Sequence, residues 1–236
     1  MSRGHERKKA VLITGAANRI GRAIAVFLAA RHGYDIAVHY NTSYEKALEL
    51  QAAIREVYGK KCELFQADLR NFSALEDLMK DVFAVLPHCN VLINNASVFY
   101  TDCLKECNIR DFEENFDIHV KSPVFLTQYF SKGCVHGGKV INIADARVTR
   151  TSTKYFSYLL SKKSLIDFTK LAATELAPNI CVNAICPTKV PDDAIDNTEA
   201  LNNIEAHPQL LELLKLVELL VDFDGYRTGE IHFMNS

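Results

Sequence analysis

Hydrophobic residues follow two alternating patterns along the chain, short continuous runs and longer segments with a helical period. The short runs are rich in β-branched residues and are bounded by turn-forming residues, as expected of buried strands. They occupy residues 10–14, 35–39, 62–66, 90–94, 139–144 and 180–186, with a weaker run at 230–233. The longer segments predict helices over residues 19–31, 44–58, 73–86, 109–130, 156–177 and 208–221.

This strict alternation of strand and helix predicts an α/β fold. Neighbouring parallel strands need crossover connections, and a helix makes such a connection with right-handed geometry. We therefore expect a doubly wound parallel sheet with helices on both faces. No linker, internal repeat or low-complexity segment divides the sequence, so one domain should span residues 1–236, with a flexible stretch at residues 1–9.

Composition and charge narrow the functional classes. The chain is 48% hydrophobic, enough for a substantial core, and its formal net charge of -2 gives no reason to expect nucleic acid as a partner. The basic opening lacks the long apolar region of a secretory signal, and no apolar run approaches membrane-spanning length, so we expect a soluble, cytoplasmic protein. The seven cysteines show no paired spacing with histidines, which indicates reduced thiols and no metal site.

Three ionisable residues form the strongest catalytic candidate. Tyr158 and Lys162 are four positions apart on a predicted helix and therefore share one face of it. A nearby ammonium favours the phenolate, so Lys162 should bring the pKa of Tyr158 down towards the working range. Asp145 lies thirteen residues before Tyr158, at the end of a predicted buried strand, and would supply a second proton-handling group. A tyrosine four residues before a lysine also arises by chance on many helices. Motifs elsewhere in the chain must therefore show whether this pair is catalytic.

The first strand-to-helix turn is the predicted site of a nucleotide. Gly15 permits the tight turn out of the strand, and Gly21 lets the helix pack close to the sheet. The amides of the loop, including Asn18, Arg19 and Ile20, would then face a pyrophosphate together with the helix N-terminus. An ordinary strand-to-helix turn is the alternative interpretation of this segment.

The end of the second strand favours NADP over NAD. A carboxylate at this position would bind the adenosine ribose hydroxyls of NAD, but the turn carries no acidic residue. Hydrogen-bond donors in the turn could instead hold the 2′-phosphate of NADP. The residues at this turn are His39, Tyr40, Asn41, Thr42 and Ser43.

Four motifs in order resemble the short-chain dehydrogenase/reductase family. They are residues 14–21, Asp68 with Leu69, residues 94–97, and Tyr158 with Lys162. The resemblance covers nearly the whole chain and implies a seven-stranded Rossmann fold and hydride transfer from a nicotinamide. It further implies that Tyr158 donates a proton, that Lys162 binds the nicotinamide ribose, that Asp68 and Leu69 lie at the adenine, and that Asn94 and Ala96 lie beside the adenosine ribose and the nicotinamide side.

Departures from the common family pattern indicate the substrate. Asp145 replaces the serine that holds a substrate carbonyl in most members, and Arg19 replaces the middle glycine of the turn. The set Arg19, Ser97, Phe99, Asp145, Tyr158 and Lys162 resembles the pteridine reductase branch, and residues 118–123 resemble dihydromonapterin reductases. Reducing a C=N bond of a dihydropterin requires a proton at a ring nitrogen, which an Asp–Tyr pair can relay. Phe99 would offer a flat face for the planar ring, with core packing as the alternative.

Two further positions depart from the pattern. His119 stands where the family carries a fourth catalytic residue, an asparagine, and could bind a water of the proton relay. Pro187 is followed by Thr188 instead of glycine, next to Val190, which the resemblance assigns to the nicotinamide carboxamide. The segment 191–207 would cover the substrate and, being short and polar, predicts an open pocket suited to a pterin.

The sequence therefore predicts an NADPH-dependent reductase that converts a dihydropterin or dihydrofolate to the tetrahydro form. One alternative is a carbonyl reductase of a small ketone. Another, motivated by His119 and Thr188, is a catalytically silent NADP-binding protein. By the same resemblance we expect a homotetramer or homodimer, with the helices at residues 109–130 and 156–177 in the interface.

Overall fold

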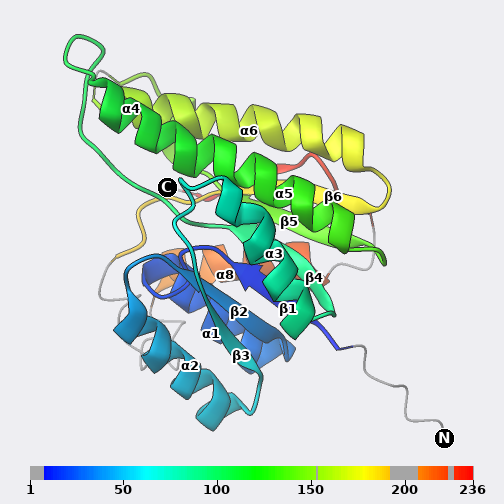
Figure 1. Ribbon diagram of the computed structural model, residues 1–236. Coiled ribbons are helices and arrows are strands. Elements are labelled where there is room, and N and C mark those ends of the chain that lie inside the picture. Colours follow the sequence, from blue (N-terminus) through cyan, green and yellow to red (C-terminus); the bar gives the residue numbers. More distant parts are fainter. Residues whose placement is uncertain (1–7, 153, 192–206, 223–225, 236) are drawn as a thin grey trace, which may run out of the picture.

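The computed structural model describes residues 8–152, 154–191, 207–222 and 226–235 of the chain (Figure 1). The greater part of the predicted flexible opening, residues 1–7, lies outside the described residues. The same holds for residues 192–206 of the predicted substrate loop. None of the helices in the described part of the chain is long and apolar enough to cross a membrane.

The described strands form one seven-stranded sheet in the order β3-β2-β1-β4-β5-β6-β7, with every neighbouring pair parallel. The predicted doubly wound parallel sheet is therefore confirmed. The predicted strand ends coincide with the observed ones or differ from them by one residue. The strands are β1 (Ala10–Ile13), β2 (Asp35–Tyr40), β3 (Cys62–Gln66), β4 (Cys89–Asn94), β5 (Gly138–Ile143), β6 (Ile180–Cys186) and β7 (Ile231–Phe233).

Helices cover both faces of this sheet (Figure 1). Alternation along β1 sends Val11 and Ile13 into one core, with α1, α2 and α8, and sends Ala10 and Leu12 into the other, with α3, α5 and α6. Each face therefore has its own apolar layer. The helices are α1 (Arg19–His32), α2 (Tyr44–Tyr58), α3 (Ser73–Val85), α4 (Ile109–Phe116), α5 (Ser122–Gly133), α6 (Phe156–Leu176) and α8 (Pro208–Asp222).

The single helix predicted over residues 109–130 is wrong in one respect, because a π-helical turn, η1 (Asp117–Lys121), separates α4 from α5. Pro123 lies in the first turn of α5 and has no N–H to continue the preceding hydrogen-bond ladder. The Ser122 hydroxyl contacts the carbonyl oxygens of Asp117 at 2.6 Å and Leu69 at 2.8 Å. The wider turn buries His119 beneath the loop that follows β4.

The sheet reverses its strand order at β1, which pairs with β2 on one side and β4 on the other. In open α/β sheets, ligands bind in the crevice at the carboxyl ends of the strands where this reversal occurs. The loops after β1, β2, β4, β5 and β6 all open at that edge. This is where the candidate residues are expected to meet.

Candidate active site

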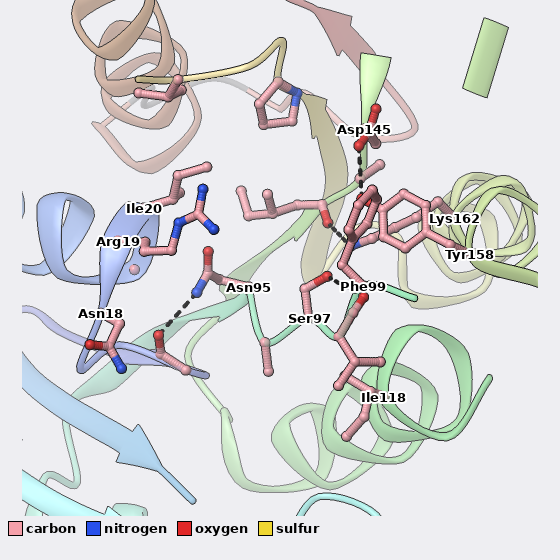
Figure 2. A pocket seen from close by; sticks show the side chains of 18 of the residues that line it. Asn18, Arg19, Ile20, Asn95, Ser97, Phe99, Ile118, Asp145, Tyr158 and Lys162 are labelled. Carbon is pink, nitrogen blue, oxygen red and sulfur yellow. Dashed lines mark hydrogen bonds between the residues drawn. The ribbon is translucent and has the colours of Figure 1, made fainter. Parts of the chain in front are cut away.

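A cavity of about 940 Å³ lies along the carboxyl edge of the sheet (Figure 2). Arg19 and Ile20 lie on one side of it, and Phe99, Tyr158 and Lys162 on the other. Most residues proposed from the sequence line this cavity, and Asp68, Asn94 and His119 do not. Those in the lining are Gly15, Asn18, Arg19, Ile20, Gly21, His39, Tyr40, Asn41, Thr42, Ser43, Leu69, Ala96, Ser97, Phe99, Asp145, Tyr158, Lys162, Pro187 and Val190.

The turn after β1 is built around close backbone contacts. Gly15 has a φ of 63°, and Arg19 also adopts a left-handed φ of 49°, a conformation that glycine usually takes. A Cβ atom on Gly21 would lie 2.5 Å from the Gly15 carbonyl oxygen and 2.6 Å from Asn95 Nδ2. Glycine at position 21 is therefore required for the helix to approach the sheet, as the sequence predicted.

His39 fixes this turn and carries no charge to it at neutral pH. The Gly15 N–H donates to His39 Nδ1 over 3.1 Å, and Nε2 lies 3.1 Å from the Ala67 carbonyl oxygen. Burial lowers the pKa of His39 to about 4, although its hydrogen bond to Ala67 opposes this. Its ring lines the cavity but both nitrogens are occupied, so it cannot act as a cation for a phosphate.

The turn after β2 presents neutral polar groups to the cavity. Asn18 Nδ2 donates to Ser43 Oγ over 2.9 Å, which joins the first turn to the second. Asn18 Oδ1 and Thr188 Oγ1, on two residues of the cavity lining, are buried and have no hydrogen-bond partner among the described residues. Unpartnered buried polar atoms that line a cavity are suited to binding a polar ligand.

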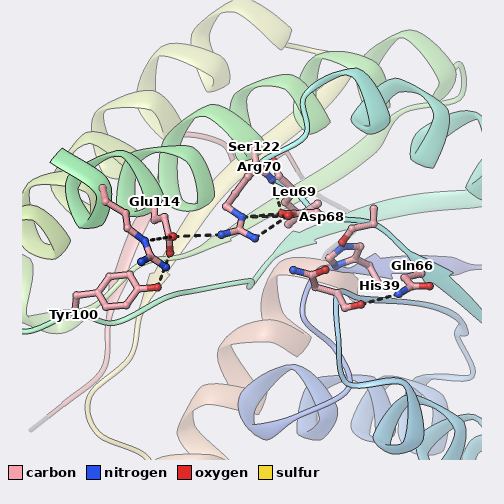
Figure 3. A network of polar contacts seen from close by, with 11 residues as sticks. His39, Gln66, Asp68, Leu69, Arg70, Tyr100, Glu114 and Ser122 are labelled. Atoms are coloured by element: carbon pink, nitrogen blue, oxygen red, sulfur yellow. Dashed lines mark hydrogen bonds and ion pairs between the residues drawn. The ribbon is translucent and has the colours of Figure 1, made fainter.

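Two residues that the resemblance assigned to the cofactor are held elsewhere by partners. Asn94 Nδ2 donates to Asn142 Oδ1 over 2.8 Å, beneath the cavity, and Asn95 lines the cavity in its place, donating to the Thr14 carbonyl oxygen over 2.8 Å. The Asp68 carboxylate binds the Arg70 guanidinium at 2.8 Å (Figure 3). The sequence showed an amide and an acid at strand ends, but it did not show these partners.

Arg70 continues the polar network of Figure 3 towards the substrate side. Its guanidinium also lies 3.3 Å from Glu114, and Glu114 accepts a hydrogen bond from the Tyr100 hydroxyl at 2.5 Å. Hydrogen bonding from Arg70 lowers the pKa of Asp68, although partial burial opposes this. The network joins the loop after β3 to the loop that carries Phe99.

The structure brings Asp145, Tyr158 and Lys162 to one wall of the cavity (Figure 2). The Tyr158 hydroxyl donates to Asp145 Oδ2 over 2.7 Å. Lys162 Nζ donates to the Ile143 carbonyl oxygen over 2.8 Å and lies 5.9 Å from the centre of the Tyr158 ring. All three side chains are buried. The carboxylate and the phenol therefore form one hydrogen-bonded pair with an ammonium beside it.

The expected effect of Lys162 on the tyrosine is wrong. Burial raises the pKa of Tyr158 above its ordinary value, and the Asp145 carboxylate raises it further. The opposing influence is Arg147, which lowers that pKa only in part. Burial also lowers the pKa of Lys162 to about 8. The tyrosine therefore keeps its proton at neutral pH, in the form that a proton donor requires.

Arg147 is a residue of this site that the sequence analysis missed. Its guanidinium binds Asp145 Oδ2 at 2.8 Å, and its backbone N–H donates to Asp145 Oδ1 over 2.7 Å at the start of a short 3-10 helix, η2 (Ala146–Thr149). The same guanidinium lies over the rings of Phe99, Tyr155 and Tyr158 at 5.0, 5.3 and 5.5 Å. The signal was available, since an aspartate at a strand end often accepts from the N–H two residues later.

The contacts of Arg147 fix the charge of Asp145. Burial pushes the pKa of this carboxyl upward, but hydrogen bonds from Arg147 and Tyr158 outweigh burial and leave the pKa below its ordinary value. Asp145 is therefore a carboxylate at neutral pH. It accepts a hydrogen bond from the Tyr158 hydroxyl and carries no proton of its own to supply.

Phe99 offers an accessible aromatic surface in the cavity. The residue is 49% exposed, so the alternative of core packing is wrong. Its ring meets Tyr158 edge-on at 4.8 Å and lies 4.7 Å from Tyr155. Tyr155 adopts a left-handed φ of 63° immediately before α6 and was not proposed from the sequence. The cavity wall at this point is therefore aromatic, with a cation beside it.

His119 lies behind the wall and cannot be reached as expected. Nε2 accepts from the Val98 N–H at 3.2 Å and is 2.8 Å from Ser97 Oγ, while Nδ1 is 2.8 Å from Ser161 Oγ. Because Nε2 is an acceptor, the neutral ring carries its proton on Nδ1. Burial lowers the pKa of His119 well below its ordinary value, with Lys162 adding to the effect. Its nitrogens are fully used within the protein, so a water-binding role has no support in this geometry.

The described residues contain no group of three or more His, Cys, Asp or Glu side chains that could hold a metal ion. All seven cysteines are free thiols. The groups available for chemistry are therefore the polar turns, the Asp145–Tyr158 pair with Arg147 and Lys162, and the aromatic wall.

Comparison with known proteins places this geometry in context. Residues 9–202 match the family model described as short chain dehydrogenase. A 3-oxoacyl-[acyl-carrier-protein] reductase FabG of Staphylococcus epidermidis is 30% identical over 221 residues, which cover 92% of this chain and 87% of that protein. The hydroxynaphthalene reductase arp2 of Aspergillus fumigatus is 29% identical over 78% of this chain and 67% of its own length.

Solved structures give the same picture. FolM alternative dihydrofolate reductase 1 from Brucella canis, complexed with NADP, has a TM-score of 0.82 and 32% identity, covering 96% of this chain and 92% of that one. A blue fluorescent protein from a metagenomic library, in complex with NADPH, has a TM-score of 0.84 and 27% identity, covering 96% of both chains. The similar proteins thus include reductases named for quite different substrates.

Proposed function

The chain belongs to the short chain dehydrogenase family, and from that premise we propose that it reduces a dihydropterin or dihydrofolate to the tetrahydro form with NADPH. The observation that carries this proposal is the 2.7 Å hydrogen bond from Tyr158 to the Asp145 carboxylate. In most of the family, as the resemblance implies, position 145 holds a carbonyl through a serine hydroxyl. A carboxylate paired with a phenol is better suited to handling a proton.

The residues of the two nucleotide turns fit NADP. The N-terminus of α1 opens into the cavity behind Gly15, and Gly21 allows the backbone to come this close. The unpartnered Asn18 Oδ1 and Thr188 Oγ1 remain available to a polar ligand. Neutral donors at Asn41, Thr42 and Ser43 suit a 2′-phosphate. Structural relatives in complex with NADP and NADPH support the same cofactor.

When bound, NADPH would supply a hydride to the carbon of the substrate C=N bond. The nitrogen of that bond must then gain a proton. Tyr158 is protonated at neutral pH and is the donor we propose, with Asp145 holding its hydroxyl in place. As the proton leaves, negative charge develops on the phenol, whose ring centre lies 5.5 Å from the Arg147 guanidinium and 5.9 Å from the Lys162 ammonium. Both cations stabilise that charge, which lowers the barrier to the transfer.

Phe99 and Arg19 would position the substrate ring. Phe99 presents a half-exposed ring beside Tyr158, and a planar bicyclic ring can stack on such a surface. Arg19 lies across the cavity, where its guanidinium could hydrogen-bond a ring oxygen or a cofactor phosphate (Figure 2). Ser97, beside His119, lines the cavity between them and completes the polar surface proposed for the substrate.

A carbonyl reductase is the second candidate, favoured by the 30% identity to a 3-oxoacyl-[acyl-carrier-protein] reductase. The two proposals separate when the protein is incubated with NADPH and either dihydromonapterin, dihydrofolate or a small diketone, following NADPH oxidation. We expect turnover of a pterin. Turnover of the diketone with none of either pterin would remove the pterin proposal. Tight NADPH binding without oxidation of any substrate would favour a silent NADP-binding protein.

We also propose that the chain assembles as a homotetramer or homodimer through α4, α5 and α6. Exposed apolar side chains on these helices support this, since Ile109 and Leu171 are 70% and 72% exposed. Sedimentation equilibrium would test it, and a monomer at micromolar concentration would contradict the proposal.

A further inference from the structure

Among the described residues, the lining of the cavity carries more positive than negative charge. The described lining includes Arg19, Arg147, Arg150, Lys162 and Lys189, but only one carboxylate, Asp145. A cavity lined by one sign of charge attracts ligands of the opposite sign. Some of these cations pair with groups of the protein or lie where the cofactor would bind, and the others remain for a further ligand.

Three of the five cations have an evident task. Arg147 pairs with Asp145 at 2.8 Å, and Lys162 donates to the Ile143 carbonyl oxygen beside Tyr158. Arg19 belongs to the turn at the N-terminus of α1, where the cofactor phosphates would lie. Arg150 and Lys189 remain. Both are exposed, and within the described part of the chain neither makes an ion pair.

Arg150 and Lys189 lie on loops that the backbone joins. Arg150 follows η2 after β5, and Lys189 follows β6, the neighbouring strand. The Ala146 N–H donates to the Pro187 carbonyl oxygen over 2.9 Å, which holds the two loops together at the cavity. The turn proposed for the 2′-phosphate follows β2, and β1 and β4 separate that strand from β5. These two cations therefore belong to the substrate end of the cavity.

We propose that Arg150 and Lys189 form a subsite for an anionic group, a carboxylate or a phosphate, on the tail of the substrate; this inference rests on the proposed function. Tyr158 and Phe99 would bind the pterin ring, which carries no charge. Arg150 and Lys189 would therefore contact only the tail that is attached to the ring. A tail of hydroxyl groups alone would leave both charges unmatched. A carboxylate or phosphate accepts charge-assisted hydrogen bonds from arginine and lysine.

The test compares three dihydropterins that differ in the tail: dihydrobiopterin with an uncharged tail, dihydrofolate with a carboxylate tail, and a dihydropterin phosphate. We expect wild-type protein to show a higher kcat/KM for at least one anionic substrate. In Arg150→Gln/Lys189→Gln, the ratio of kcat/KM for that substrate to kcat/KM for dihydrobiopterin should fall about tenfold, because two partly exposed ion pairs are lost. Comparing dihydrofolate with the dihydropterin phosphate shows whether the subsite binds a carboxylate or a phosphate.

The control is Arg31→Gln/Lys215→Gln, which removes the same charges from exposed positions on α1 and α8. These positions do not line the cavity, so the control should keep the wild-type ratio. Added salt should reduce the preference of the wild-type protein, because it screens exposed charges. An unchanged ratio in the Arg150/Lys189 variant, or no preference for either anionic tail, would overturn the subsite.

A binding measurement separates this inference from the proposed function. Calorimetry of NADP⁺-saturated protein with p-aminobenzoylglutamate, and separately with inorganic phosphate, uses the anionic groups without a pterin. If no pterin is reduced but one probe binds and loses about tenfold in affinity in the Arg150/Lys189 variant, the subsite stands and the pterin proposal fails. If pterins are reduced but no anionic preference and no probe binding is found, the subsite fails alone.

Discussion

The Asp145 carboxyl is held between an arginine and a tyrosine, and these contacts set its charge. Burial favours its neutral form, whereas Arg147 and the Tyr158 hydroxyl favour the carboxylate. When the pKa of a carboxyl is lower in the native state than in the unfolded chain, the group stabilises the fold at every pH above its unfolded pKa. This stability is lost as the pH falls through the native pKa. Arg147 therefore supports both the fold and the charge that the proposed chemistry requires.

Arg147→Met should shift the acidic limb of the pH–rate profile to higher pH. Methionine keeps a side chain over the aromatic rings but removes the guanidinium, so the effect of burial on Asp145 is no longer offset. The pH profile of kcat/KM, with the dihydropterin that the protein turns over fastest, measures this shift. Arg110→Met, at an exposed arginine on α4, is the control and should leave the limb in place. An acidic limb at the same pH in wild type and Arg147→Met would contradict the role given to Arg147.

The Lys162 ammonium should define a basic limb in the same profile. Burial lowers its pKa to about 8, so the cation beside Tyr158 is lost as pH rises through that value. We expect kcat/KM to fall above pH 8. In Lys162→Arg the guanidinium stays protonated, so any remaining activity should lack this limb. Activity that stays level to pH 10 in the wild-type protein would show that the ammonium is not needed.

The sequence located Asp145, Tyr158 and Lys162 because their spacing and their positions at the end of a strand and on a helix are local features. It did not predict that the pKa of Tyr158 rises, since that depends on burial, which spacing does not reveal. Arg147 was missed for a related reason. Its contacts depend on η2 turning the chain back towards Asp145, a feature too short to give a periodic pattern.

The π-helical turn η1 determines the position of His119 between the loop after β4 and α6. The hydrophobic period predicted one continuous helix, because a single wider turn changes few apolar positions. The family resemblance led us to expect that His119 binds a water of the proton relay, whereas it lies behind Ser97 and contacts Ser161. Its hydrogen bonds hold together the two elements that carry Phe99 and Tyr158.

His119→Leu should destabilise the fold by about 1–3 kcal/mol, since the buried Ser161 hydroxyl, the Val98 N–H and the Ser97 hydroxyl all lose their partner on the imidazole ring. Urea denaturation at pH 7 measures the change. A loss below about 0.5 kcal/mol would mean that these groups find other partners. The exposed His136, outside these contacts, offers the control His136→Leu, which should lie within about 0.5 kcal/mol of wild type.

The parallel, doubly wound sheet could be predicted from the alternation of strands and helices, because parallel strands require helical crossovers. Partners that are distant in sequence could not be predicted. Asn94 is bonded to Asn142, and Asp68 to an arginine that continues to Glu114. Each of these contacts depends on which strands and loops become neighbours, which the positions of the motifs in the sequence do not reveal.

Two buried neutral histidines should make the whole molecule sensitive to mild acid. The pKa of His39 is lowered by burial from 6.5 to about 4, and that of His119 is lowered well below 6.5 by burial and Lys162. Below pH 6.5 these histidines are protonated in the unfolded chain but remain neutral in the native state, so the free energy of unfolding falls as the pH drops. Each group should contribute a slope of about 1.4 kcal/mol per pH unit between pH 6 and 4.5.

Urea denaturation across this range gives the slope directly. His39→Gln should reduce it by about 1.4 kcal/mol per pH unit, because glutamine has no proton to gain in this range. Equal slopes for wild-type and variant protein would show that His39 is protonated in the native state as readily as in the unfolded chain.

The central claim is that Tyr158, positioned by the Asp145 carboxylate, delivers the proton for reduction of a pterin C=N bond. Its most direct test is a single turnover of NADPH-loaded protein with dihydromonapterin or dihydrofolate, comparing wild type, Tyr158→Phe and Asp145→Ala. We predict that each variant slows reduction by at least about 100-fold, the usual contribution of a positioned acid or base. NADPH affinity should change by less than about twofold, because neither side chain contacts the phosphate-binding turns. Full pterin reduction by Tyr158→Phe would mean that the proton comes from another donor, and full reduction by Asp145→Ala would mean that the hydrogen bond from Tyr158 to this carboxylate plays no part in delivering it.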